Sequence, residues 1–138
     1  MEFWPSPQTL NFATAASDIL IADATFSTAP RSFHQVLTVH CRISNDMGYE
    51  WVPVLHAVMR NKTLQSYNII FSAMQRRWSE MNIEANVRTV RTDYEEAIMK
   101  AVSETFGSAA VKGCLFHYCQ AVINSVRKFG LIQFYDEF

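Results

Sequence analysis

Two aspartates stand at positions where a carboxylate could do chemistry. Asp23 interrupts the apolar segment DILIADATF (18–26), and Asp93 follows NVRTVRT (86–92) immediately before a helical pattern begins. Carboxylate oxygens are the ligands that Mg²⁺ and Mn²⁺ prefer, and Mg²⁺ keeps several waters when bound. A pair of such ions roughly 4 Å apart can activate an attacking oxygen and stabilise a leaving one in phosphodiester chemistry. The two acids therefore predict a divalent-metal site, provided that the fold brings them together.

A second set of reactive side chains lies in the segment GCLFHYC. Cys114, His117 and Cys119 could ligate Zn²⁺, but a closed structural zinc site needs four ligands, and the chain has no C-x-x-C or H-x-x-H pair. Cys119 falls on the apolar stripe of a predicted helix and is expected in the core, and Cys114 is expected to be a small buried residue. We therefore expect no structural zinc. His117 lies off that stripe, at the end of the sheet where the acids are expected.

Hydrophobic periodicity indicates which elements must position these residues. Alternating or continuous apolar patterns predict five strands, at 18–26, 35–43, 50–59, 86–92 and 109–115. Apolar residues spaced by three or four predict three helices: one from the N-cap Thr63 to Met81, one that ends at Gly107, and one over 116–129. The order βββ-α-β-α-β-α predicts an α/β fold with helices packed against a mixed sheet.

Topology rules turn this element order into a sheet. The second and third strands form a hairpin, and Pro53 places the third strand at an edge. The first strand, which is apolar apart from Asp23, is expected to be buried on both faces, between the second strand and a parallel fourth strand. The predicted five-stranded order is 3-2-1-4-5, and the element order is that of a ribonuclease-H-like domain. Asp23 and Asp93 are then expected at the same carboxyl end, where open α/β sheets bind ligands.

Simpler roles stay open for both acids at this point. Asp93 precedes YEEA and could serve as the N-cap of the helix that follows. Asp23 could lie exposed in a turn that begins early, at DATF. A shared metal site is the one hypothesis that explains both aspartates together.

Length and composition restrict the class of protein. The chain has 138 residues, 49% of them hydrophobic, which suits one folded domain, and its formal net charge is −1, without a polybasic tail. We expect residues 1–17 to form a loose lead-in. No apolar run is long enough for a membrane span, and the N-terminus lacks the pattern of a secretory signal. Three cysteines, an odd number, favour a reducing intracellular location over secretion.

Four segments in this order resemble a known family. They are IADATFSTAPRSFHQVLTVH, VPVLHAVMRNKT, VRTDYEEAIMKAVSETF and VKGCLFHYCQAV. Together they are similar in order and spacing to the Mutator-like (MULE) transposase domain. The likeness runs from residue 18 to residue 131, which we expect to be the catalytic core.

The resemblance implies a ribonuclease-H-like fold and a DDE-type transposase of nuclear location. Such enzymes hydrolyse phosphodiester bonds at transposon ends and join the freed 3′ hydroxyls to new DNA, with two Mg²⁺ or Mn²⁺ ions. Asp23 matches the first catalytic, metal-binding carboxylate of the family and Asp93 the second. Cys114 and His117 match its C-x-x-H motif, which implies a role for His117 near the DNA phosphate or the metals.

The chain departs from the family pattern in two places. Ala24 replaces the usual Gly, a small change for a strand residue. The third catalytic acid of the family, a Glu, lies downstream of a helical insertion, and residues 132–138 fall where that insertion should start. Asp136 and Glu137 are therefore poor matches for the third acid, which is not identified in this chain.

Three functions follow from this pattern. The first is a transposase core that carries two of the three acids. The second is a catalytically inactive, degenerate or domesticated copy that acts as a DNA-binding or protein-binding module, a reading that the near-neutral charge favours. The third, an unrelated ribonuclease-H-fold nuclease, accounts poorly for the ordered motifs. An apolar stripe on the last helix would promote association if left uncovered, and a homodimer is one candidate outcome.

Overall fold

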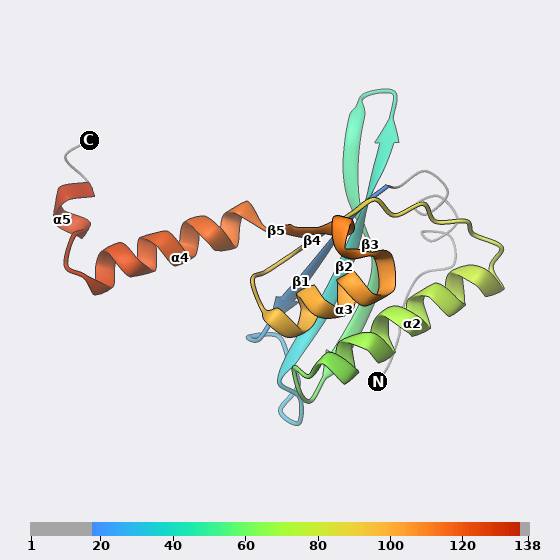
Figure 1. Ribbon diagram of the computed structural model, residues 1–138, viewed down its shortest axis with the longest axis horizontal. Helices are drawn as coiled ribbons and strands as arrows, with labels where there is room; N and C mark the ends of the chain where they lie inside the picture. Colours follow the sequence, from blue (N-terminus) through green and yellow to red (C-terminus); the bar gives the residue numbers. More distant parts are fainter. Residues whose placement is uncertain (1–17, 136–138) are drawn as a thin grey trace.

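The mixed sheet is the centre of the protein in the computed structural model, which describes residues 18–135 (Figure 1). Its five strands have the order β3-β2-β1-β4-β5 that the sequence predicted. Their bounds are β1 Ile19–Thr25, β2 Gln35–Asn45, β3 Gly48–Met59, β4 Thr89–Thr92 and β5 Val111–Gly113. Of the predicted domain limits, the 1–17 lead-in lies outside the described residues.

The strand directions are those expected from the connections. β1 pairs antiparallel with β2, β2 pairs antiparallel with β3 as a hairpin, and β4 runs parallel to both β1 and β5. The β2–β3 register shifts where Val39 pairs with Leu55 and His40 with Pro53, so Val54 is an extra residue in a β-bulge. Pro53 therefore lies in an edge strand beside a bulge, which is where a sheet tolerates the loss of a backbone donor.

Two helices cover one face of the sheet, as Figure 1 shows in green and orange. α2 spans Leu64–Glu80 and begins at the predicted N-cap Thr63, whose hydroxyl accepts a hydrogen bond from the Ser66 backbone N–H at 3.2 Å. α3 spans Glu96–Phe106 and ends at Gly107, whose φ of 92° suits glycine. The predicted β-α-β-α order is thus confirmed up to this point of the chain.

The core lies between these two helices and the sheet. β1 contributes Leu20 and Ala22, β2 contributes Leu37 and Val39, and the helices contribute the buried side chains Tyr67, Ile70, Phe71, Met74, Trp78, Ile98, Ala101 and Val102. Alternate strand residues point to the two faces of a sheet, so this core uses only one face of β1. Within residues 18–135 no helix covers the other face.

The prediction that β1 is buried on both faces is therefore wrong. Its burial alternates, and the Asp23 side chain keeps 47% of its surface exposed. Asp23 is a partly hydrated carboxylate on the open face of the sheet. Its degree of burial therefore gives no reason to expect a metal ion there. The apolar run that suggested a doubly buried strand is explained by one face against the core and half-buried Ile19 and Ile21 on the other.

The last helix also departs from the prediction. α4, at Leu115–Lys128, has no buried residue and extends away from the sheet, with the short helix α5, Ile132–Tyr135, beyond it (Figure 1). The predicted core position of Cys119 is wrong, because Cys119 is exposed, and Cys114 is only partly buried. Apolar side chains of α4 are largely exposed, among them Leu115, Phe116, Tyr118 and Phe129. Within residues 18–135, the Tyr118 ring lies near that of Tyr94.

Two predicted strands are shorter than their apolar patterns. β4 begins only at Thr89, because the backbone N–H groups of Arg88 and Thr89 both donate to the Asp18 carbonyl, where pairing with β1 starts. Before that point, Ile83, Ala85 and Val87 pack against the core without strand pairing. A 3₁₀ turn, Ser108–Ala110, precedes β5. No helix in the described part of the chain combines the length and apolar character of a membrane span.

The packing of α2 against α3 gives the first testable prediction. Phe71 is fully buried, and its ring meets that of Phe106 edge to face with centroids 6.0 Å apart. We expect Phe71→Ala to lower the free energy of unfolding by about 3–5 kcal/mol, because it leaves a cavity between the helices. Urea denaturation measures the change. Ile69→Ala, at a residue 50% exposed on the same helix, is the control and should change the free energy by less than about 1 kcal/mol.

Candidate active site

The parallel pairing of β1 with β4 sets the relative position of the two predicted acids. Ile19 pairs with Thr89, Leu20 with Val90 and Ile21 with Arg91. This last pair stands two residues before each acid, and Asp93 directly follows β4. Adjacent strands in a sheet lie about 4.8 Å apart, so the two backbones approach closely at this end. The two acids therefore belong to the same end of neighbouring parallel strands.

Asp93 does not cap the helix that follows it. The N-cap of α3 is Glu95, and the Asp93 carboxylate instead accepts a hydrogen bond from the Glu95 backbone N–H at 3.3 Å. This contact closes an Asx-type turn between β4 and α3. The N-cap alternative for Asp93 is thus replaced by a turn that holds one of its carboxylate oxygens.

His117 is the third predicted residue that reaches this end of the sheet. Its Nε2 lies 3.7 Å from Oδ1 of Asp23, and its Nδ1 is buried without a hydrogen-bond partner among the described residues. Cys114, the N-cap of α4, donates its backbone N–H to the Thr92 carbonyl at 2.7 Å, which fastens the β5–α4 junction to the end of β4. The C-x-x-H segment therefore brings His117 beside Asp23 through a backbone contact of Cys114 and not through the thiol.

Gly113 makes room for an aromatic side chain at this junction. A Cβ on Gly113 would overlap the ring of Tyr94, the residue next to Asp93. The Tyr94 ring lies 6.3 Å from that of Tyr118 and is 55% exposed. Glycine at this position therefore lets the Tyr94 ring pack against the backbone of β5.

Side chains from β1, β2 and β3 interact electrostatically on the open face of the sheet. His40 lies opposite Ile21 on β2, and its pKa is lowered from 6.5 mainly by burial and also by the nearby His56, whereas the Asp23 charge partly raises it. His56 shares a hydrogen bond with Thr38, Nδ1 to Oγ1, at 3.1 Å. The Asp23 charge therefore interacts with His40 on the neighbouring strand, an interaction that the sequence did not predict.

The structure does not assemble a complete metal-binding cluster. Within residues 18–135 no group of three or more His, Cys, Asp and Glu side chains is close enough to hold a metal ion. The candidate third acid, Glu137, lies outside the described residues, as does Asp136. The described site thus consists of Asp23 and Asp93 at one end of the sheet, with His117 beside Asp23.

Four residues that sequence reasoning missed surround the Asp93 turn: Gln35, Lys62, Tyr67 and Glu95. They are linked by hydrogen bonds and an ion pair. Gln35, Lys62 and Glu95 lie in segments that resemble the family, but the sequence assigned none of them a role at the site.

Fold and site together define an α/β domain whose mixed sheet presents two acids at the carboxyl ends of adjacent parallel strands. Comparison with family models gives the class its name. Residues 19–121 match the model of the MULE transposase domain, so the chain belongs to the MULE transposase domain family. No curated protein matches the chain significantly.

The field around Asp23 gives the second testable prediction. We expect Asp23→Asn to lower the pKa of His40 further, because the Asp23 charge is the effect that raises it. An NMR titration of the His40 ring measures the change. Asp93→Asn is the matched control and should shift the His40 pKa less; an equal shift would contradict this assignment.

The same lowered pKa fixes the sign of a pH dependence. A folded-state pKa below 6.5 means that the unfolded chain binds the His40 proton more readily. The His40 contribution to stability is therefore full above pH 6.5 and is lost as the pH falls toward the folded-state pKa. Urea denaturation from pH 7.5 down to pH 5.5 should show less acid destabilisation in His40→Gln.

Proposed function

We propose that this domain is the core of a DDE-type transposase with a ribonuclease-H-like fold, acting on phosphodiester bonds of DNA. The observation that carries the proposal is the parallel β1–β4 register, whose last pair, Ile21 with Arg91, stands two residues before each acid. Membership of the MULE family supports a transposase function and DNA as the partner. The strand order β3-β2-β1-β4-β5 is consistent with the ribonuclease-H-like assignment.

Mg²⁺ or Mn²⁺ suits the donors available at this site. Asp23 offers a half-exposed carboxylate, and Asp93 offers a second one from the adjacent strand end. Two carboxylates with room for water are what hard divalent cations accept, and no sulfur ligand is needed. Asp23 and Asp93 would hold the metal, which supplies Lewis-acid activation of a phosphate oxygen and of water when bound.

The chain's own residues orient this site. The hydrogen bond from the Glu95 N–H fixes one oxygen of Asp93 and leaves the other available to a ligand. His117, with Nε2 3.7 Å from Asp23, can donate a hydrogen bond to that carboxylate after a small movement, or contact a phosphate that lies between them. Cys114 positions His117 through its backbone N–H.

The remaining parts of the proposal concern the extent and surroundings of the domain. Residues 18–131 would form the catalytic core, and residues 132–138 would begin the helical insertion that separates the third acid from the other two. The proposed location is nuclear or otherwise intracellular, as the likeness to the family implies. The exposed apolar side chains of α4 would suit association with another protein segment, including a second copy of this domain.

One observation favours a second candidate function, a catalytically inactive module that binds DNA or protein. The described residues bring no third carboxylate into a metal-holding cluster with Asp23 and Asp93. With terminal-inverted-repeat DNA and Mn²⁺, strand nicking that is lost in Asp23→Asn and in Asp93→Asn supports the transposase core. DNA binding without nicking that is the same with and without Mn²⁺, and is retained in Asp23→Asn and in Asp93→Asn, supports the inactive module.

Metal binding by the parent protein is the fourth testable prediction. We expect Mn²⁺ at 100 times its dissociation constant to stabilise the fold by about 2.7 kcal/mol, seen as a rise in the melting temperature. Asp23→Asn and Asp93→Asn should each abolish the rise, because each removes one anionic ligand. Asp46→Asn, in the β2–β3 turn at the other end of the sheet, is the matched control and should retain it. A parent protein without any rise, or variants that keep it, would contradict a shared metal site.

A further inference from the structure

We propose that Gln35, Tyr67, Glu95 and Lys62 form a positioning brace that fixes the Asp93 turn and ties it to the segment after Asp23. The inference deepens the proposed function and rests on it for the role of the two acids. The brace itself consists of contacts among described residues, so it can be tested without metal or DNA.

The brace is a continuous chain of polar contacts. Gln35 donates from Nε2 to the Tyr67 hydroxyl at 2.9 Å, and the Tyr67 hydroxyl donates to Oε1 of Glu95 at 3.0 Å. Lys62 completes the chain with an ion pair from Nζ to Oε2 of Glu95 at 2.9 Å. Four elements of the fold meet here: the start of β2, α2, the turn before α3 and the segment that follows β3.

The burial of these hydrogen-bonded side chains indicates that the brace has a role beyond packing. Gln35 is fully buried, Tyr67 is 1% exposed, and burial of such polar groups costs free energy unless they are hydrogen-bonded. Burial also raises the pKa of Tyr67, so its hydroxyl keeps the proton that it donates to Glu95. An apolar pair would fill the same space at lower cost, but it could not hold the Glu95 carboxylate.

The brace acts on Asp93 through the backbone of Glu95. With both carboxylate oxygens held, by Tyr67 and by Lys62, Glu95 is fixed in place, and its N–H donates to the Asp93 carboxylate at 3.3 Å. Loss of either side-chain contact frees the turn and broadens the directions available to Asp93. Glu95 is a positioning residue and not a metal ligand, because both of its oxygens already have partners.

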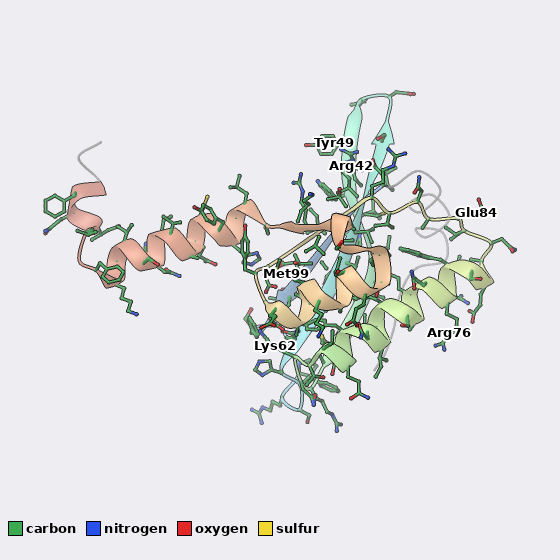
Figure 2. The ribbon with its side chains drawn as sticks, viewed as in Figure 1. Arg42, Tyr49, Lys62, Arg76, Glu84 and Met99 are labelled. Atoms are coloured by element: carbon green, nitrogen blue, oxygen red, sulfur yellow. The ribbon has the colours of Figure 1, made fainter. Side chains whose placement is uncertain are left out.

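Lys62 extends the brace to Phe26, which directly follows the strand that carries Asp23. Its ammonium lies 4.3 Å from the centre of the Phe26 ring, a cation–π contact, while it also pairs with Glu95. Phe26 comes three residues after Asp23, and Glu95 two residues after Asp93. Figure 2 shows Lys62 at the end of the sheet opposite the β2–β3 hairpin with Arg42 and Tyr49. Lys62 thus joins the two segments whose spacing sets the separation of the acids.

Hydrogen exchange of the Glu95 amide, followed by NMR in the metal-free protein, tests the brace directly. We expect Tyr67→Phe and Lys62→Met each to accelerate exchange of this amide by about 2- to 10-fold, the effect of weakening one hydrogen bond. Lys62→Arg should restore slow exchange, because it keeps the ion pair. Arg77→Met, which removes the 3.2 Å surface pair with Glu80 near the end of α2, is the matched control and should leave the Glu95 amide unchanged.

A second readout connects the brace with the metal site. We expect Tyr67→Phe and Lys62→Met to raise the dissociation constant of Mn²⁺ by about 10-fold, as losses of partners that orient a ligand do. Urea denaturation of each variant shows that the protein measured is folded.

The outcomes separate the brace from the proposed function. A parent protein that binds no Mn²⁺ refutes the metal site, and the exchange rates still decide on the brace. Unchanged Glu95 exchange in both Tyr67→Phe and Lys62→Met overturns the brace, whatever the metal does. Loss of Mn²⁺ binding in Glu95→Gln, with normal binding in Tyr67→Phe and Lys62→Met, also overturns it, because Glu95 would then be a ligand.

Discussion

Parallel pairing of β1 with β4 is the interaction on which the site depends. Three consecutive residue pairs, from Ile19–Thr89 to Ile21–Arg91, set the register, and a shift of one residue would turn every side chain of one strand to the opposite face. The chain between the two strands runs through β2, β3 and α2, so their pairing closes a long loop. The cost in chain entropy is offset by the core between the helices and the sheet.

Within residues 18–135 helices cover one face of the sheet, so the residues of the proposed site have different surroundings on its two faces. The covered face holds the brace, in which Gln35 and Tyr67 are almost completely buried and their positions are fixed by packing. The open face holds Asp23, half hydrated, with His40 and His117 nearby. A site of this kind combines a rigid support with access for a large substrate such as a nucleic-acid strand, which a closed pocket would exclude.

Local patterns predicted most of the fold but not the surroundings of its side chains. Strand order followed from alternation, turns and Pro53, and the helix ends followed from Thr63 and Gly107, because these signals depend on a few neighbouring residues. The exposure of Asp23 could not be predicted, since an apolar run looks the same whether one face or both faces of its strand are covered. The brace was equally hidden: Gln35 and Tyr67 are 32 residues apart, and only the tertiary fold brings them together.

The two borders of the sheet influence how copies of this domain could meet. β3 is interrupted by a bulge and a proline, and β5, at the opposite border, has only three residues. Neither border offers the long, regular ladder of unpaired amides and carbonyls that recruits a strand from another molecule. Strand-to-strand growth into fibrils is thereby disfavoured at high concentration, and protein contacts are left to helical surfaces, where they can remain discrete and reversible.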